Sequence, residues 1–203
     1  MPNADFFARL GLFVVEDFFE PDLCARLRAE VRSAPRNQAE VARKGIDLID
    51  ETVRRTKQVT VPGWMVSLVK ERLLALKPKV ESHFHSVLTG CEMPQFLVYG
   101  PGDFFQQHRD SNPEPGRPEH QYLKDRRVSV VIFLNSEAQE ASEDSYSGGS
   151  LTIYGLMVEP PWNRCGFPLV GIRGMLIAFP SQLTHEVTPV KCGERSTIVS
   201  WLA

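Results

Sequence analysis

The first half of the chain carries apolar residues at helical spacing. Pro21, a residue well tolerated in the first turn of a helix, is followed by apolar side chains four residues apart, Leu23, Leu27 and Val31. From Gly63 to Leu88, apolar residues recur every three or four positions: Trp64, Leu68, Val69, Leu73, Leu76, Val80, Phe84 and Val87. The pattern predicts two helices that pack on the core through these residues, with Pro78 kinking or dividing the second.

After Gly90 the spacing changes to short runs rich in β-branched and aromatic residues, separated by Gly, Pro and Ser. These runs predict strands over residues 95–99, 128–134, 150–154, 175–179 and 197–202, and residues 12–19 predict an earlier one. Many short strands without intervening helices indicate an antiparallel barrel or sandwich. Three polar stretches are expected to lie outside this core: 37–62, a loop with short edge strands, and 111–126 and 136–149, two surface loops.

Composition narrows the possible partners. The chain has 203 residues, 42% hydrophobic and 24% charged, with a formal net charge of -2, so we expect one domain and no nucleic-acid partner. It has no run of about 18 apolar residues and no basic segment leading into an apolar one near Met1, so we expect no membrane partner and a cytoplasmic location. The four cysteines are far apart and form no C-x-x-C pair, which predicts unpaired thiols and no zinc site.

Two histidines and a carboxylate form the candidate metal site. His108 and Asp110 are two residues apart, so on an extended segment both side chains point to one face. His185 follows 75 residues after His108. Two histidines and one carboxylate on one face of a metal, with the remaining positions open, form the facial triad of non-haem iron oxygenases. Two polar residues on a strand are common, however, so His-x-Asp alone leaves a structural role open.

Five longer blocks resemble one family. The string from Tyr99 to Asp110, YGPGDFFQQHRD, resembles the segment Y-x-x-G-x-x-(aromatic)-x-x-H-x-D of the prolyl 4-hydroxylase group within the 2-oxoglutarate oxygenases. Four further blocks resemble that family's pattern in the same order: Arg126 to Asn135, Gly148 to Ile153, Ala178 to Ser181, and His185 to Pro189 with Arg195 and Trp201 downstream. The resemblance extends from Phe13 to Ala203 and is strong after Gln95.

The resemblance implies a chemistry and a set of roles. His108, Asp110 and His185 would bind Fe(II), which 2-oxoglutarate chelates through one carboxylate and its keto oxygen before O2 binds; ascorbate would have a supporting role. The far carboxylate of 2-oxoglutarate needs a buried cation, and Arg195 stands where the family carries its basic residue. Thr197, on the same strand face, would add a hydroxyl, and Tyr99 would donate a hydrogen bond to the co-substrate.

One position departs from the family pattern, and one alternative stays open. Phe133 stands where some members have a tyrosine that reaches the far carboxylate, so Arg195 and Thr197 would have to suffice. Tyr99 could instead be a core tyrosine with a hydrated hydroxyl.

The resemblance also implies the fold: mainly β with supporting α, a double-stranded β-helix (jelly roll, cupin-like) of about eight strands with N-terminal helices packed on one face. Residues 1–203 would form a single 2-oxoglutarate/Fe(II) oxygenase domain. Within it, residues 1–94 would supply the helical support and a lid loop, and residues 95–203 the catalytic barrel core. The reaction implied is hydroxylation with release of succinate and carbon dioxide, and halogenation is not expected because Asp110 keeps the carboxylate.

The substrate is predicted to be a prolyl residue in a peptide or protein. Trp201 would offer an aromatic wall to the proline ring, although a tryptophan there is also simply good packing. Arg126 or Arg127 would contact a backbone carbonyl at the rim, and Lys44 to Lys57 would close as a lid. Two alternatives remain: a hydroxylase of a free amino acid or other small molecule, and a non-catalytic metal-binding barrel that acts as a sensor or binding module.

Overall fold

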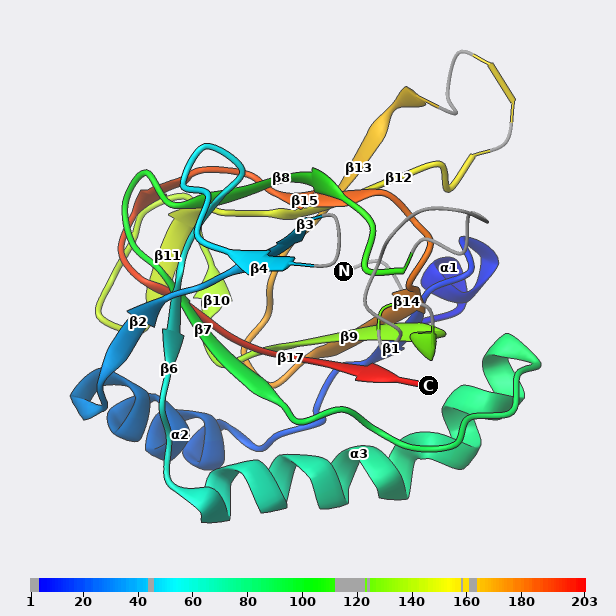
Figure 1. Ribbon diagram of the computed structural model, residues 1–203, viewed down its shortest axis with the longest axis horizontal. Helices are drawn as coiled ribbons and strands as arrows, with labels where there is room; N and C mark the ends of the chain where they lie inside the picture. The colour runs from blue at the N-terminus through cyan, green and yellow to red at the C-terminus, as the bar shows by residue number, and fades with distance from the viewer. Residues whose placement is uncertain (1–3, 44–45, 112–122, 124, 158, 161–163) are drawn as a thin grey trace.

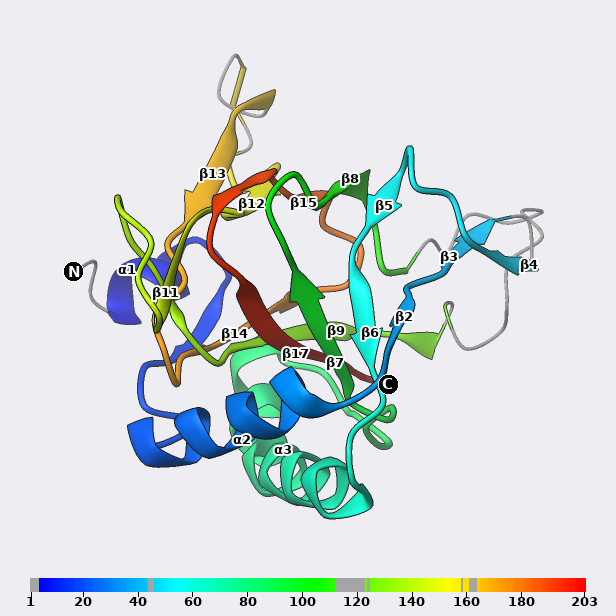
Figure 2. The ribbon, with the colours of Figure 1, turned by 90° about the vertical axis from the view of Figure 1, so that its left-hand side faces the viewer.

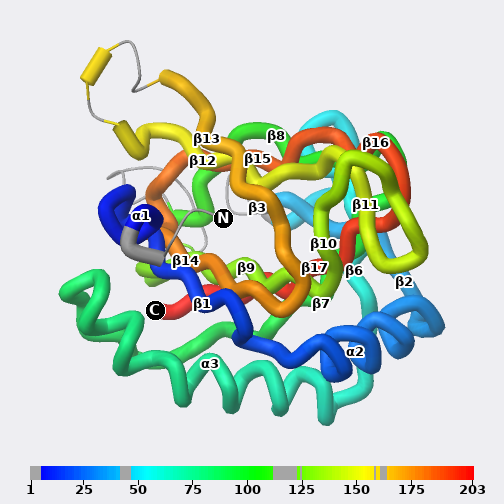
Figure 3. The backbone as a smooth tube through the Cα atoms, turned by 180° about the vertical axis from the view of Figure 1, so that it is seen from behind, coloured from blue at the N-terminus to red at the C-terminus, as the bar shows by residue number. Residues whose placement is uncertain are grey.

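Three layers build the protein: two helices, a seven-stranded sheet and a five-stranded sheet (Figures 1 and 2). The computed structural model describes residues 4–43, 46–111, 123, 125–157, 159–160 and 164–203. Figure 1 shows the helices at the bottom, the seven-stranded sheet in the middle and the five-stranded sheet at the top. Seen from behind, the five-stranded sheet again lies opposite the helices (Figure 3).

The seven-stranded sheet, called the major sheet below, is antiparallel throughout. Its strands, in spatial order, are β1 (Phe13–Val15), β14 (Leu176–Pro180), β9 (Val128–Phe133), β17 (Arg195–Leu202), β7 (Gln95–Tyr99), β6 (Lys57–Val59) and β2 (Arg36–Gln38). All six residues of β9 are buried, because the helices cover one face of the sheet and the second sheet covers the other. A strand buried on both faces needs an apolar run, and VSVVIF supplies one.

Helices α2 (Pro21–Ser33) and α3 (Gly63–Phe84) cover the outer face of the major sheet, while a short helix α1 (Ala4–Arg9) precedes β1. The expected apolar faces of α2 and α3 do meet the sheet in one hydrophobic cluster. One expectation for the apolar face was wrong: Trp64 is 39% exposed and Val87, beyond the end of α3, is 86% exposed, while Met65 fills the core instead. Of the two effects expected of Pro78, division of the helix does not occur, because α3 continues through it.

The five-stranded sheet, called the minor sheet below, faces the inner side of the major sheet. Its strands are β13 (Gly166–Leu169), β12 (Leu151–Tyr154), β15 (His185–Val187), β8 (Phe104–His108) and β5 (Arg54–Arg55). Two small sheets stand beside it, one of β10 (Ser136–Glu137), β11 (Ser145–Gly148) and β16 (Val190–Cys192), the other of β3 (Val41–Arg43) and β4 (Ile46–Leu48). The predicted jelly roll with helices on one face is therefore confirmed.

The polar stretches are more ordered than their composition suggested. The predicted surface loop 136–149 contains β10 and β11, and Tyr146 is fully buried. In the stretch proposed as a lid, residues 44–45 lie outside the described part, while Arg54 to Lys57 belong to both sheets through β5 and β6. Most of the predicted loop 111–126 also lies outside the described residues. No helix in the described ranges is long and apolar enough to span a membrane.

Candidate active site

A cavity of about 330 Å³ lies between the major and minor sheets. Side chains from the minor sheet line one wall: Arg54, Phe105, His108, His185 and Val187. Side chains from the major sheet line the other: Leu97, Tyr99, Val131, Arg195, Val199 and Trp201. On β17, Arg195, Val199 and Trp201 line this space, as the alternation of side chains along a strand requires. Thr197, expected on the same face, is not among the lining residues but accepts a hydrogen bond from Arg195. The cavity therefore gathers most of the residues that the sequence singled out.

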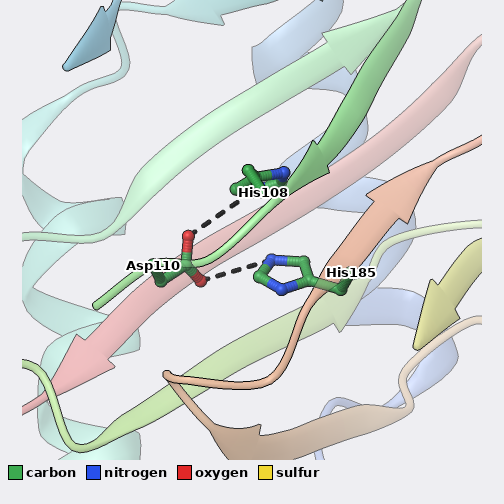
Figure 4. Close-up of side chains that lie close together, drawn as sticks. All are labelled: His108, Asp110 and His185. Atoms are coloured by element: carbon green, nitrogen blue, oxygen red, sulfur yellow. Dashed lines mark ion pairs between the residues drawn. The ribbon is translucent and has the colours of Figure 1, made fainter. Parts of the chain in front are cut away.

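Strand pairing closes the long sequence gap between the two histidines. His108 ends β8, and His185 begins β15, its antiparallel neighbour, where the two residues stand directly opposite each other. Asp110 follows β8 by two residues, and its backbone N–H donates to the Ser181 carbonyl at 3.0 Å. Figure 4 shows the three side chains converging from these two strands. The sheet thus assembles a cluster that no local motif contains.

The donor atoms of the cluster fit a divalent metal. His108 Nε2 lies 3.5 Å and His185 Nε2 3.4 Å from the Asp110 carboxylate, and the ligand atoms all lie within 4.8 Å of one another. Each Nδ1 is within hydrogen-bond distance of a backbone carbonyl, at 2.8 and 2.9 Å, so each Nε2 is left for a metal. Two imidazoles and one carboxylate suit Fe(II) and leave coordination positions open. No other such cluster occurs among the described residues.

Two neighbours hold the candidate ligands in place. The sequence did not single out Ser129, and it marked Phe105 only as the aromatic of the family string, without this contact. The Ser129 hydroxyl donates to Asp110 Oδ2 at 2.6 Å. The ring of Phe105 stacks on the ring of His108 with centroids 3.5 Å apart and planes at 16°. Ser129 did carry a signal, because it is the polar residue inside the apolar run VSVV. A buried strand tolerates such a residue where it has a polar partner.

Mutual electrostatics set the protonation of the cluster. Burial alone would raise the pKa of Asp110, but His185 and His108 hold it well below its usual range. Burial, followed by repulsion from His185, lowers the pKa of His108 to about 4. For His185, burial opposes the charged form, yet Asp110 and the Leu183 carbonyl raise its pKa. Asp110 is therefore favoured as an anion and His108 as a neutral imidazole, the forms in which a carboxylate and a histidine bind a metal ion.

Arg195 lines the same cavity as a buried cation. It is 1% exposed, and its guanidinium carbon lies 5.0 Å from the Tyr99 ring centroid and 5.3 Å from that of Phe133. Its Nη1 donates to the Thr197 hydroxyl at 3.1 Å, while its Nε has no partner among the described atoms. Some members of the family have a tyrosine at the position of Phe133. In this protein Phe133 presents a ring face to Arg195 and no hydroxyl. A buried guanidinium with an unused donor fits the far carboxylate of 2-oxoglutarate.

Tyr146 is a further neighbour of Arg195 that was not recognised from the sequence. Burial raises the pKa of its hydroxyl to about 12, against the attraction of Arg195. The hydroxyl therefore stays neutral at physiological pH. It lay inside a stretch predicted as a loop, where no periodicity marked it.

The two arginines predicted to meet the substrate are placed differently. Arg126 lines the cavity, with its guanidinium carbon 3.5 Å from the Trp201 ring centroid. Its Nε and Nη2 donate to the Glu92 carboxylate at 2.6 and 2.7 Å. Arg127, which like Arg126 precedes β9, is exposed and is not among the residues that line the cavity. Glu92 was another residue that the sequence did not reveal as part of this group.

Two facing antiparallel sheets with a His-Asp-His cluster between them define a jelly-roll protein with a facial-triad metal site. The family model for the 2OG-Fe(II) oxygenase superfamily matches residues 94–203, which is more than half of the chain. The chain belongs to this superfamily.

Curated relatives carry the description PKHD-type hydroxylase. One from Hyphomonas neptunium is 28% identical over 194 residues, covering 94% of this chain and 77% of the relative. One from Shewanella baltica is 31% identical over 109 residues, covering 54% of this chain and 42% of the relative. The match therefore spans less than half of the Shewanella protein.

Solved structures share the fold. A Pseudomonas putida prolyl-4-hydroxylase is 24% identical with a TM-score of 0.66, covering 98% of this chain and 95% of that one. A Trichoplax adhaerens prolyl hydroxylase, in complex with a hypoxia-inducible factor peptide fragment, is 18% identical with a TM-score of 0.68, covering 98% and 86%. An epimerase, SnoN from nogalamycin biosynthesis, is 11% identical with a TM-score of 0.63, covering 98% and 80%. One fold thus serves different reactions, so the reaction must be argued from the site.

Proposed function

We propose that the protein is an Fe(II)- and 2-oxoglutarate-dependent hydroxylase of a prolyl residue in a peptide or protein. One observation carries the proposal: the His108, Asp110 and His185 cluster shares a single cavity with Arg195, a buried cation with an unused donor. A metal cluster alone would suit a sensor or a binding module. A buried cation in the same cavity adds a place for the far carboxylate of a chelating keto acid.

Each residue has a defined part in this reaction. His108, Asp110 and His185 hold the metal, and Ser129 and Phe105 fix the carboxylate and one imidazole. The iron, when bound with 2-oxoglutarate and O2, supplies the oxidising power, and the carbon dioxide and succinate formed come from the co-substrate. Arg195 and Thr197 hold the far carboxylate of 2-oxoglutarate, and Tyr99, whose ring lies beside the Arg195 guanidinium, donates a hydrogen bond to the co-substrate.

The wall formed by Trp201 and Arg126 supports a prolyl substrate. Glu92 fixes the Arg126 guanidinium, which in turn covers one face of the indole. Such a preordered aromatic wall suits a proline ring, which has apolar faces and no amide hydrogen to satisfy. The prolyl hydroxylases among the proteins of similar fold, one of them bound to a peptide, agree with this choice.

The test is to incubate the protein with Fe(II), 2-oxoglutarate and O2, with and without ascorbate, and to measure succinate. Libraries of proline-containing and proline-free peptides, together with free amino acids, would be analysed by mass spectrometry for a gain of one oxygen. We expect the oxygen on proline within a peptide. Oxidation of free small molecules alone would favour the small-molecule hydroxylase, and no succinate with any substrate would favour the non-catalytic barrel. A chlorinated product would contradict hydroxylation.

A further inference from the structure

A second buried arginine lines the cavity close to the metal ligands. Arg54, on β5, is 9% exposed, and its Nη1 donates to the Glu40 carbonyl at 2.8 Å. Its guanidinium carbon lies 4.8 Å from the centroid of the Phe105 ring, and that ring stacks on His108. The guanidinium, the phenyl ring and the imidazole therefore form a stack that leads to the metal site.

The charge of Arg54 has no counter-ion in the described part of the chain. The neighbouring Arg126 is held by Glu92 through Nε and Nη2. No described carboxylate lies within ion-pair distance of Arg54. Its Nε, the atom that in Arg126 donates to Glu92, is buried without a partner. Burial lowers the pKa of Arg54, against attraction from Tyr99 and Asp110, yet a guanidinium stays protonated in a protein.

Leaving a cation in this position is costly unless something compensates for it. A charge removed from water loses solvation free energy, which an ion pair or good hydrogen bonds can offset. The face of Phe105 offsets part of this loss, and Asp110 is committed to the metal and to Ser129. An anion that enters the cavity would supply the missing partner.

We propose that Arg54 binds a carboxylate group of a ligand on the metal side of the cavity. This inference rests on the proposed function, which already gives the far carboxylate of 2-oxoglutarate to Arg195. Two sources of the carboxylate share this chemistry: the end of 2-oxoglutarate that meets the metal, and a carboxylate on the primary substrate near the reacting carbon. The guanidinium group of Arg54 is planar, and its Nε has no partner. The edge that carries Nε can therefore donate two parallel hydrogen bonds to the two oxygens of a carboxylate.

The first experiment measures co-substrate binding without turnover. 2-Oxoglutarate is titrated anaerobically into the Mn(II)-loaded protein by calorimetry, for the native chain and for Arg54→Gln, Arg54→Lys and Arg55→Gln. Arg55 is the matched control, because it follows Arg54 on the same strand but is exposed and lies over Phe104. Thermal denaturation shows whether each variant is folded. Arg54→Lys keeps the positive charge but lacks the planar guanidinium that donates two parallel hydrogen bonds.

The second experiment compares acids with amides. Binding to the Mn(II)-loaded protein is measured for L-proline and L-prolinamide, and for a proline-terminated peptide with a free or an amidated C-terminus. A preference of about tenfold or more for the acid in the native chain, lost in Arg54→Gln and kept in Arg55→Gln, assigns the carboxylate to the primary substrate. A loss of 2-oxoglutarate affinity of about tenfold or more in Arg54→Gln, smaller in Arg54→Lys, assigns it to the co-substrate.

The proposal is overturned if Arg54→Gln binds 2-oxoglutarate as the native chain does and the native chain shows no preference for either acid. Failure of the proposed function is a separate result. It would appear as a native chain that binds no 2-oxoglutarate at all, and the acid and amide comparison would still decide the role of Arg54.

Discussion

The two sheets that enclose the cavity differ in what covers them. The major sheet lies between the helices and the cavity, and every residue of its β9 strand is buried. In the described part of the chain no helix covers the outer side of the minor sheet, and Gln106 and Gln107 of β8 are exposed. The cavity takes the two histidines of the candidate metal site from the minor sheet, and it takes Arg195, the cation proposed to bind the co-substrate, from the major sheet.

The two sheets therefore suit two different roles: the major sheet holds a buried cation, and the minor sheet presents the candidate metal ligands. A strand that is covered on both faces can hold a cation such as Arg195 away from water, because neighbouring rings and hydroxyls replace the solvent. Metal ligands need a different setting, because the ion and its other ligands must reach them from outside. Ends of strands in the less covered sheet provide that access, and His108 and His185 stand at such ends.

The largest expected effect comes from breaking the minor-sheet side. His108→Ala, Asp110→Ala or His185→Ala should each abolish succinate formation, because two ligands cannot fix the geometry of the metal. The fold should remain largely intact, since none of the three belongs to the hydrophobic clusters. Succinate assays with circular dichroism check both points, with Gln107→Ala as the control. Normal turnover in any of the three variants would contradict the assignment.

A large loss of stability is expected when the helix-covered side is disturbed. Ile198, on β17, is fully buried in the cluster between the helices and the major sheet. Ile198→Ala should lower the free energy of unfolding by about 2–5 kcal/mol, since it removes methyl groups and leaves a void. Gln107→Ala on the exposed face of the minor sheet should change it by less than about 0.5 kcal/mol. Chemical denaturation measures both, and equal losses would remove the distinction between the sheets.

Arg195→Ala tests the co-substrate end of the major sheet. It should weaken 2-oxoglutarate binding by about 3 kcal/mol, roughly a hundredfold, because two charge-assisted hydrogen bonds are lost. Calorimetry with the Mn(II)-loaded protein measures this without turnover, and Arg36→Gln, which breaks only the surface pair with Glu194, is the control. An unchanged affinity would show that another cation holds the far carboxylate.

The smallest expected effect concerns the side-chain hydrogen bond from β9 of the major sheet to the carboxylate of the metal cluster. Ser129, on β9, donates to Asp110, and Ser129→Ala should weaken metal binding by about tenfold, or ~1.4 kcal/mol. Competition with a metal-binding dye measures the affinity. Unchanged metal binding would mean that the minor sheet positions the carboxylate unaided.

Regular spacing carried most of the fold prediction. The strand expected at residues 95–99 is β7 without any shift of boundary, and the start of α2 at Pro21 was also correct. The fold prediction was wrong at positions where the burial of a side chain cannot be inferred from the polarity of its neighbours in the sequence. Tyr146 lies in a polar stretch but packs beside Arg195, and Trp64 has a core-like position on α3 but is partly exposed while Met65 is buried. Neighbours from distant parts of the chain decide such cases.

For the site, the sequence by itself determined the types of chemical group: two histidines and a carboxylate in the register of an oxygenase, and a basic residue ten positions later. These residues could be found because metal chemistry demands particular donors at positions that a strand can present. Arg54 and Glu92 had no such mark, and Phe105 was marked only as the aromatic of the family string. The tertiary structure placed Arg54 and Phe105 in the cavity and Glu92 on Arg126. Their roles depend on burial and on the absence or presence of a partner, and both are properties of the assembled sheets.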